Sequence, residues 1–403
     1  MTAVNSLAVP RVLIAEADPW VRDLLVGLVL NVRCDAVLEL SADGHQAREW
    51  LAHHQADLII ADWGLPGTDG LTLLHGVRQQ RRQPAVPFIL LSNRSDKASV
   101  REAVVQAPTA YLTKPLNMDG LRQRLESLLL SSGEPIAFKT PSLAPGLTLS
   151  DFLESHRDSA EGAPLSIDVR EAIAQSQGKD GLDAVKLSQA LRSDPHITAV
   201  LIAAANSSTQ HLGTPVQTLS QALQALGPTQ SINLLNGLAV KRNATLTDQA
   251  LLDHAQRFWA ASRLTAEYAR SMARLRELDQ ERCYCAGLLH NLGDLAVLRC
   301  LQDWLTAGGE LEEGAVEAAL KNFGAGFGST LRTRWRLPLE LRQLIASVYQ
   351  FAGGVHSRKA LVMNVAAQLA RLGPDDEVDA LVNSKPARLL KIGASELNRL
   401  RLV

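Results

Sequence analysis

The stretch Leu58-Ile59-Ile60-Ala61-Asp62 decides the fold of the first part of this 403-residue chain, because four apolar residues run directly into an aspartate. A short apolar run of this kind is typical of a buried strand in a parallel sheet. Three other segments share the pattern and also end on a polar residue: Ile14-Ala15-Glu16, Phe88-Ile89-Leu90-Leu91-Ser92 and Tyr111-Leu112-Thr113-Lys114. Parallel sheets gather their chemistry at the carboxyl ends of their strands. The sequence therefore predicts that these four ends meet at one edge of a sheet.

The four strand-end residues carry the functional groups that an acyl-phosphate site needs. Asp62 supplies a carboxylate nucleophile, and Glu16 supplies a second carboxylate that could hold a divalent cation. The Ser92 hydroxyl can bond a phosphoryl oxygen, and the Lys114 ammonium offsets the negative charge that gathers in the transition state. The alternative, unconnected polar residues at four strand ends, requires four coincidences. We therefore expect Asp62 to be an aspartate that can be phosphorylated.

Residues 10–131 resemble the receiver domain of two-component response regulators. The segment Asp62-Trp63-Gly64-Leu65-Pro66-Gly67-Thr68-Asp69-Gly70 is similar to the phosphoacceptor loop of that family. Ser92 stands at the switch hydroxyl position, Tyr111 at the switch aromatic, and Lys114 before the family's proline, often in a cis peptide. The resemblance implies a flavodoxin-like, doubly wound, five-stranded parallel sheet with Asp62 as phosphoacceptor. It also implies Mg²⁺ held by Glu16, Asp62 and the Gly64 carbonyl.

One departure from the family bears on that metal. Receivers usually end the first strand with two adjacent acidic residues, whereas here Glu16 is followed by Ala17. The missing carboxylate removes one hard oxygen ligand and about one unit of negative charge from a Mg²⁺ site. We expect Mg²⁺ to bind weakly, unless Asp18 reaches back to compensate. The sequence leaves open whether Mg²⁺ binding and phosphorylation survive this loss.

Composition and length indicate a multidomain protein without a strong charge bias. A 403-residue chain exceeds one ordinary hydrophobic core. The net charge of -1 argues against a large surface for nucleic acid. No segment has the roughly twenty apolar residues of a membrane span, and none resembles a secretion signal, so we expect a cytoplasmic protein. The cysteines form no C-x-x-C pair and are expected to be buried or reduced thiols: Cys34, Cys283, Cys285 and Cys300.

The second half of the chain has helical periodicity and no convincing series of strands, so we expect it to be all-α. Residues 161–372 resemble HDOD domains through short segments in the family's order: Leu187 to Ser207, Pro215 to Gly227, Phe258-Trp259, Gly287-Leu288-Leu289-His290-Asn291-Leu292-Gly293 and Arg334-Trp335-Arg336-Leu337-Pro338. The resemblance implies a signalling module that acts by binding other proteins. The expected boundaries are a receiver at 1–133, a linker with at most a short helix at 134–160, the HDOD domain at 161–372 and a helical tail at 373–403.

The metal site of the related HD phosphohydrolases is degenerate here. Those enzymes bind a dication with an upstream histidine, a His-Asp pair and a later aspartate. This chain has His290-Asn291 as its pair, and alanine stands where the upstream histidine is expected after Phe258-Trp259. We therefore expect a non-catalytic domain, with His290 as a packing or hydrogen-bonded residue that could pair with Asp294 four residues later.

Two further patterns have simple structural interpretations. Gly324, Gly326 and Gly328 lack the Gly-Lys-Ser/Thr of a phosphate loop, so we expect a turn between helices there. Basic clusters alternate with core residues and lack interleaved aromatics, which favours solvated helix faces over nucleic-acid binding: Arg332, Arg334, Arg336 and Lys385, Arg388, Lys391, Arg399, Arg401.

The sequence thus predicts a bacterial response regulator that a sensor histidine kinase phosphorylates on Asp62. Its receiver is expected to control the HDOD module, which in turn binds a downstream signalling protein. Two alternatives stay open: a scaffold that works without phosphorylation, and residual HD-type phosphohydrolase activity at His290. The sequence does not identify the kinase, the downstream partner, the direction of coupling, or whether the chain forms a homodimer.

Overall fold

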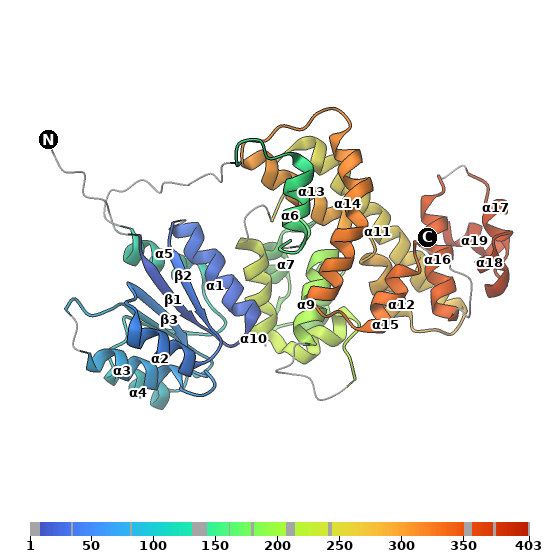
Figure 1. The fold of residues 1–403 in the computed structure, drawn as a ribbon. Coiled ribbons are helices and arrows are strands. Elements are labelled where there is room, and N and C mark those ends of the chain that lie inside the picture. Colours follow the sequence, from blue (N-terminus) through green and yellow to red (C-terminus); the bar gives the residue numbers. More distant parts are fainter. Residues whose placement is uncertain are drawn as a thin grey trace. The chain divides into compact units, whose positions relative to one another are not determined.

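The computed structural model describes residues 9–33, 35–80, 83–130, 143–160, 162–178, 181–206, 214–240, 244–349, 357–373 and 376–401. Cys34, the start of the expected linker and the last two residues of the expected tail lie outside these ranges. The chain divides into two compact units (Figure 1): one comprises residues 1–140 together with 229–242, and the other residues 141–228 together with 243–403.

The first unit contains the predicted parallel sheet, with strands in the order β2-β1-β3-β4-β5. The strands are β1 (Arg11–Ala15), β2 (Val37–Ser41), β3 (Leu58–Asp62), β4 (Phe88–Ser92) and β5 (Ala110–Thr113). Every residue of β3 and β4 is buried, which explains why their sequences are continuously apolar and not alternating. The five-stranded, doubly wound sheet is therefore confirmed.

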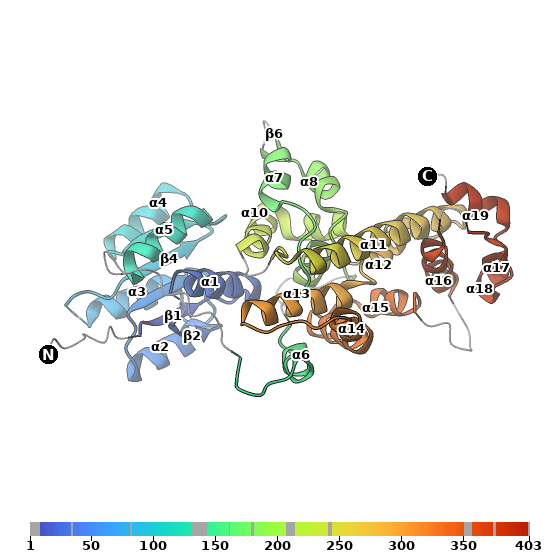
Figure 2. The same ribbon diagram turned by 90° about the horizontal axis from the view of Figure 1, so that it is seen from above.

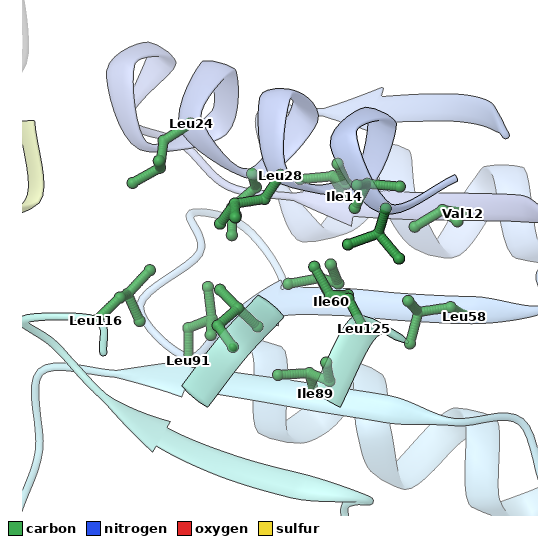
Figure 3. Packing of buried hydrophobic residues seen from close by; sticks show 14 of the residues in the cluster. Val12, Ile14, Leu24, Leu28, Leu58, Ile60, Ile89, Leu91, Leu116 and Leu125 are labelled. Atoms are coloured by element: carbon green, nitrogen blue, oxygen red, sulfur yellow. The ribbon is translucent and has the colours of Figure 1, made fainter. Parts of the chain in front are cut away.

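Helices cover both faces of this sheet because alternate strand residues point to opposite sides. Leu58 and Ile60 pack toward α1 (Pro19–Val32) and α5 (Met118–Leu129), in the cluster that Figure 3 shows. Ile59 and Ala61 pack on the other face, in the cluster that includes residues of α2 (Gly44–His53), α3 (Gly70–Gln79) and α4 (Lys97–Val105). The two apolar layers fix the direction in which every strand ends.

The second unit is mainly helical. Its central elements are α11, α12, α13 and α14, which pack in sequence-adjacent pairs (Figure 2), and α11 also packs against α16. Its helices are α6 (Leu149–Arg157), α7 (Val169–Gln175), α8 (Ala184–Leu191), α9 (Pro195–Ala205), the first part of α10 (Leu219–Val240), α11 (Gln249–Leu275), α12 (Gln280–Leu288), α13 (Leu292–Thr306), α14 (Ala315–Arg334), α15 (Leu339–Ala346), α16 (Arg358–Arg371), α17 (Asp379–Val382), α18 (Lys385–Leu390) and α19 (Ala394–Arg401).

The structure adds three details to this unit. A small antiparallel pair, β6 (Gln177–Gly178) and β7 (Gly181–Leu182), interrupts the helices; two-residue strands are too short to show a period in sequence. The expected linker contains α6, which packs on α13 and α14 with Phe152 buried against Trp304. The expected tail also packs, since α18 contacts α16.

One expectation about this unit is wrong: the glycines at 324, 326 and 328 lie inside α14 and not in a turn between helices. Two of them permit a close helix crossing. A Cβ added to Gly293 on α13 would lie 2.1 Å from the Gly324 carbonyl oxygen and 2.5 Å from the Gly328 nitrogen. Helix backbones approach this closely only where side chains are absent, so Gly293, Gly324 and Gly328 permit the crossing, whereas an added Cβ on Gly326 would meet only the Arg157 side chain at 3.5 Å.

Candidate functional site

Four side chains meet at the carboxyl edge of the receiver sheet. Glu16 follows β1, Asp62 ends β3 and Ser92 ends β4, while Lys114 directly follows β5. The parallel register holds these ends side by side, with Asp62 opposite Leu91 and Ser92 opposite Thr113. The expected cis peptide at Lys114-Pro115 is present.

Lys114 joins the two carboxylates. Its Nζ lies 2.9 Å from Glu16 Oε2 and 3.0 Å from Asp62 Oδ1, and all three side chains are at most 10% exposed. Burial raises the pKa of Glu16, and Asp62 adds to the increase, while Lys114 opposes it. Burial alone would lower the pKa of Lys114, but the two carboxylates outweigh it and the pKa of the ammonium is raised. At neutral pH the site therefore holds one cation between two buried acids.

Asp18 does not replace the carboxylate that is missing at Ala17. Its Oδ1 caps α1 by accepting from the backbone N–H groups of Trp20 and Val21, at 2.9 and 3.4 Å. Its own backbone N–H donates to Glu16 Oε1 at 3.0 Å. Asp18 thus orients Glu16 and starts the helix, and its capping oxygen is directed to α1.

The donors at this edge fit a Mg²⁺ ion that keeps several of its waters. Asp62 Oδ1 is buried, and it faces the Lys114 ammonium at 3.0 Å. A Cβ added to Gly64 would lie 3.2 Å from Asp62 Oδ2, so the backbone of residue 64 is beside the same carboxylate. Among the residues that the structure describes, no three His, Cys, Asp or Glu side chains cluster to hold a metal. Mg²⁺ commonly uses one or two protein carboxylates, which is what this site offers.

Ser92 and Tyr111, the expected switch residues, are connected through Arg94, which sequence reasoning missed. The backbone N–H of Arg94 donates to Ser92 Oγ at 3.0 Å, and the Tyr111 hydroxyl donates to the Arg94 carbonyl at 2.5 Å. The Arg94 guanidinium lies 4.7 Å from the centre of the Trp63 ring, which also meets Tyr111 edge to face. Backbone contacts of this kind leave no residue signature. The loop after β4 is thus hydrogen bonded to both Ser92 and Tyr111.

In the helical unit, the degenerate His-Asn pair is engaged in local hydrogen bonds. His290 is 6% exposed, and its Nδ1 lies 2.6 Å from the Gly287 carbonyl oxygen. Asn291 donates to Ser262 Oγ at 3.2 Å and more weakly to the Phe258 carbonyl at 3.4 Å. Burial lowers the pKa of His290 to about 4. These residues fill the centre of the unit and present no donor set for a dication.

Asp294 does not pair with His290 as expected, because the ring is already held by Gly287. It lies against α14, where a Cβ on Gly324 would be 2.2 Å from Asp294 Oδ1. Burial raises the pKa of Asp294 to about 6. Arg332 also departs from expectation: it is half-buried, and burial lowers its pKa, whereas Arg334 and Arg336 are exposed.

The sheet order and the acidic edge with its lysine define a receiver fold. Family comparison agrees: residues 12–126 match the response regulator receiver domain, and residues 163–351 match the HDOD domain. The chain therefore carries an N-terminal receiver domain and a C-terminal HDOD domain, and its receiver homologues support a two-component response regulator.

Individual relatives match the receiver region. A probable C4-dicarboxylate response regulator of Bacillus subtilis is 28% identical over 116 residues, 29% of this chain and 50% of the relative. A chemotaxis protein CheY homolog of Campylobacter jejuni is 27% identical over 129 residues, 32% of this chain and 98% of the relative. The chain spans 50%, 58% and 65% of the first three curated relatives that it matches.

Two solved structures also match parts of the chain. The signal receiver domain of an HD domain-containing protein from Pseudomonas fluorescens is 26% identical, with a TM-score of 0.26, and the match covers 30% of this chain and 95% of that one. The MmoQ response regulator from Methylococcus capsulatus is 20% identical, with a TM-score of 0.45, and covers 60% of this chain and 99% of that one. Within the described residues, no helix is both long and apolar enough for a membrane span.

Proposed function

We propose that this protein is a response regulator in which Asp62 accepts a phosphoryl group from a sensor histidine kinase. The receiver then modulates a non-catalytic HDOD module that acts in the cytoplasm by binding a downstream signalling protein. The observation that carries the proposal is the buried Asp62 carboxylate, whose Oδ1 lies 3.0 Å from the Lys114 ammonium.

The chemistry follows from the groups at the sheet edge. An Asp62 oxygen attacks phosphorus as the P–N bond of the donor phosphohistidine breaks, and the donor imidazole keeps the electron pair of that bond. Lys114 stabilises the charge on the transferring phosphoryl oxygens. Glu16, Asp62 and the Gly64 carbonyl would hold Mg²⁺, which when bound supplies further neutralisation of those oxygens.

The arrival of a phosphoryl group changes the partners of Ser92 and Lys114. The Ser92 hydroxyl turns from the Arg94 N–H to a phosphoryl oxygen, and Lys114 turns from Glu16 toward the same group. Because Tyr111 is hydrogen bonded to the Arg94 carbonyl, the loop after β4 and the aromatic ring move together. This repacking is the local event that carries the signal to the surface.

Incubation with acetyl phosphate or a cognate kinase in the presence of Mg²⁺ tests the proposal. We expect a shifted band on a phosphate-affinity gel for the wild type and no shift for Asp62→Asn. Asp69→Asn is the matched control, because Asp69 is exposed and caps α3, a role that asparagine fills equally well. An unmodified wild type beside a labelled control receiver would refute phosphorylation.

A pull-down that compares wild type with Asp62→Asn identifies the partners whose binding depends on phosphorylation of Asp62.

A second candidate function is a scaffold that works without phosphorylation, and the Ala17 position favours it. With Asp18 committed to α1, only Glu16 and Asp62 remain as carboxylates at the edge, and Lys114 contacts both. Ala17→Asp restores the third carboxylate. If the fluorescence of the buried Trp63 responds to Mg²⁺ only in this variant, the wild-type site does not bind Mg²⁺ at the concentrations of the titration, and the scaffold is supported. Equal responses favour the phosphorylated regulator.

Residual phosphohydrolase activity is not proposed. His290 is held by Gly287, Asn291 donates its amide hydrogens to Ser262 and Phe258, and alanine replaces the upstream histidine. The donor set does not fit the dication that HD chemistry needs.

A further inference from the structure

Helix α10 is two helices divided at Gly227, and the second belongs to the receiver unit. Gly227 has φ 72° and ψ 172°, a non-helical conformation that glycine adopts without strain, and Pro228 follows it. The division between the two compact units falls directly after Pro228. Residues 229–240, called here the reporter helix, therefore come from within the HDOD match but fold with the receiver.

The reporter helix contacts the receiver through one face, formed by Gln230, Asn233 and Gly237 at helical spacing. Asn233 is 3% exposed, and its Oδ1 accepts from the backbone N–H of Leu116 at 2.8 Å. Gln230 Nε2 donates to Asp18 Oδ2 at 2.5 Å. Gly237 lies against Leu24 of α1, where an added Cβ would be 3.3 Å from that side chain.

Both hydrogen bonds end next to residues that hold Asp62. Asp18 donates its backbone N–H to Glu16, and Leu116 is two residues after Lys114, which bridges Glu16 and Asp62. Leu24 and Leu116 lie at the same end of the apolar cluster in Figure 3. The reporter helix thus touches the two loops that adjoin the ion pairs of Glu16, Asp62 and Lys114.

We propose that the receiver surface formed by Asp18, Leu24 and Leu116 is the docking site for the reporter helix, and that docking weakens when the ion pairs of Asp62 change. The inference rests on the proposed function only in taking Asp62 as the group that signalling alters. A change at Asp62 repositions Lys114 and Glu16, and these shifts move the Leu116 N–H and the Asp18 carboxylate that bind the helix. Gly227 is then the joint through which the rest of the HDOD domain receives the change.

Hydrogen–deuterium exchange with amide resolution on the full chain tests the docking. The Leu116 amide is the direct probe, because its hydrogen-bond acceptor is the Asn233 side chain and Leu116 is only 3% exposed. In Asn233→Ala we expect Leu116 to exchange about fivefold faster, the effect of losing one net hydrogen bond. Asn236→Ala is the matched control, the same change on the same helix at a half-buried position. Equal exchange of Leu116 in the two variants would refute docking.

Opposite charges introduced at Gln230, which is not fully buried, should change the exchange rate of the reporter helix in opposite directions. Gln230→Glu places a carboxylate against Asp18 and should speed exchange in residues 229–240, whereas Gln230→Lys forms an ion pair and should slow it. The same direction in both variants would overturn the assigned contact.

Asp62→Asn tests the coupling without any phosphoryl transfer, since it removes one of the two carboxylates that hold Lys114. We expect Leu116 and the reporter helix to exchange about twofold faster or more, the usual range of such coupling. Unchanged exchange would refute the coupling even if the gel assay shows that Asp62 is phosphorylated. Faster exchange in a protein that is never phosphorylated would leave the coupling standing and refute the proposed function.

Discussion

Replacement of Lys114 by methionine should strongly destabilise the receiver at neutral pH. The ammonium is the bridging charge between Glu16 and Asp62, at 2.9 and 3.0 Å, and all three side chains are at most 10% exposed. Methionine fills a similar volume, so the main loss is electrostatic. Removing one partner from a buried ion pair costs about 3 to 5 kcal/mol, because the remaining charges stay desolvated. We expect a loss of that size in the free energy of opening of the receiver.

The pKa of Glu16 gives this prediction a pH dependence. Burial raises that pKa, so ionisation of Glu16 is unfavourable in the folded state. The folded state therefore favours protonated Glu16. This contribution to stability is fully present below the pKa of an unfolded glutamate, and it is lost as pH rises through the raised pKa of the folded state. Without Lys114 that loss becomes larger. The difference between wild type and Lys114→Met should therefore shrink as pH falls through the carboxylate range.

Native-state hydrogen exchange of receiver peptides in the full chain measures the effect, because two-domain unfolding does not give one free energy. Lys97→Met, at an exposed position on α4, is the control and should change little. Adding Glu16→Gln to Lys114→Met should recover part of the loss. A difference below about 1 kcal/mol at neutral pH, the value of an exposed pair, would refute the buried bridge.

Two predictions concern the HDOD domain. Gly293→Ala should lower its stability by about 1 to 3 kcal/mol, because the new methyl group overlaps the backbone of α14. Gly326→Ala is the control and should be neutral or stabilising, because its new methyl group meets only a side-chain atom at 3.5 Å. Thermal unfolding followed by circular dichroism compares the two variants, and equal melting temperatures would contradict the close crossing. Acid stability should depend on two opposing groups. His290, with a pKa of about 4, loses stability as pH falls from 6.5, by roughly 3 kcal/mol at most, while Asp294, with a pKa of about 6, loses stability as pH rises from 3.8. Asp294→Asn should therefore increase the loss of stability between pH 6.5 and 4.5, and His290→Asn should reduce it. Urea titrations at the two pH values measure this loss, and the opposite ranking of the two variants would show that these pKa directions are wrong.

The departures from the sequence-based expectations share one physical cause. Gly324 and Gly328 are helix breakers when judged locally, yet the close crossing with Gly293 of α13 makes them necessary inside α14. His290 and Asp294 have the spacing of a helical pair, but the Gly287 carbonyl is a closer partner for the ring. In both cases a backbone group decided the outcome, the facing helix for the glycines and the carbonyl three residues earlier for His290, and the spacing of side chains does not report backbone partners.

The sequence by itself determined the sheet and the convergence of Glu16, Asp62, Ser92 and Lys114, because apolar runs and parallel connections dictate where strands end. Only the tertiary structure decided that Asp18 turns to α1 and to the reporter helix. Asn233 and Leu116 are 117 residues apart, and Gln230 and Asp18 are 212 apart. A polar face of glutamine, asparagine and glycine has no apolar period, so the surface that it binds becomes recognisable only when the chain is folded.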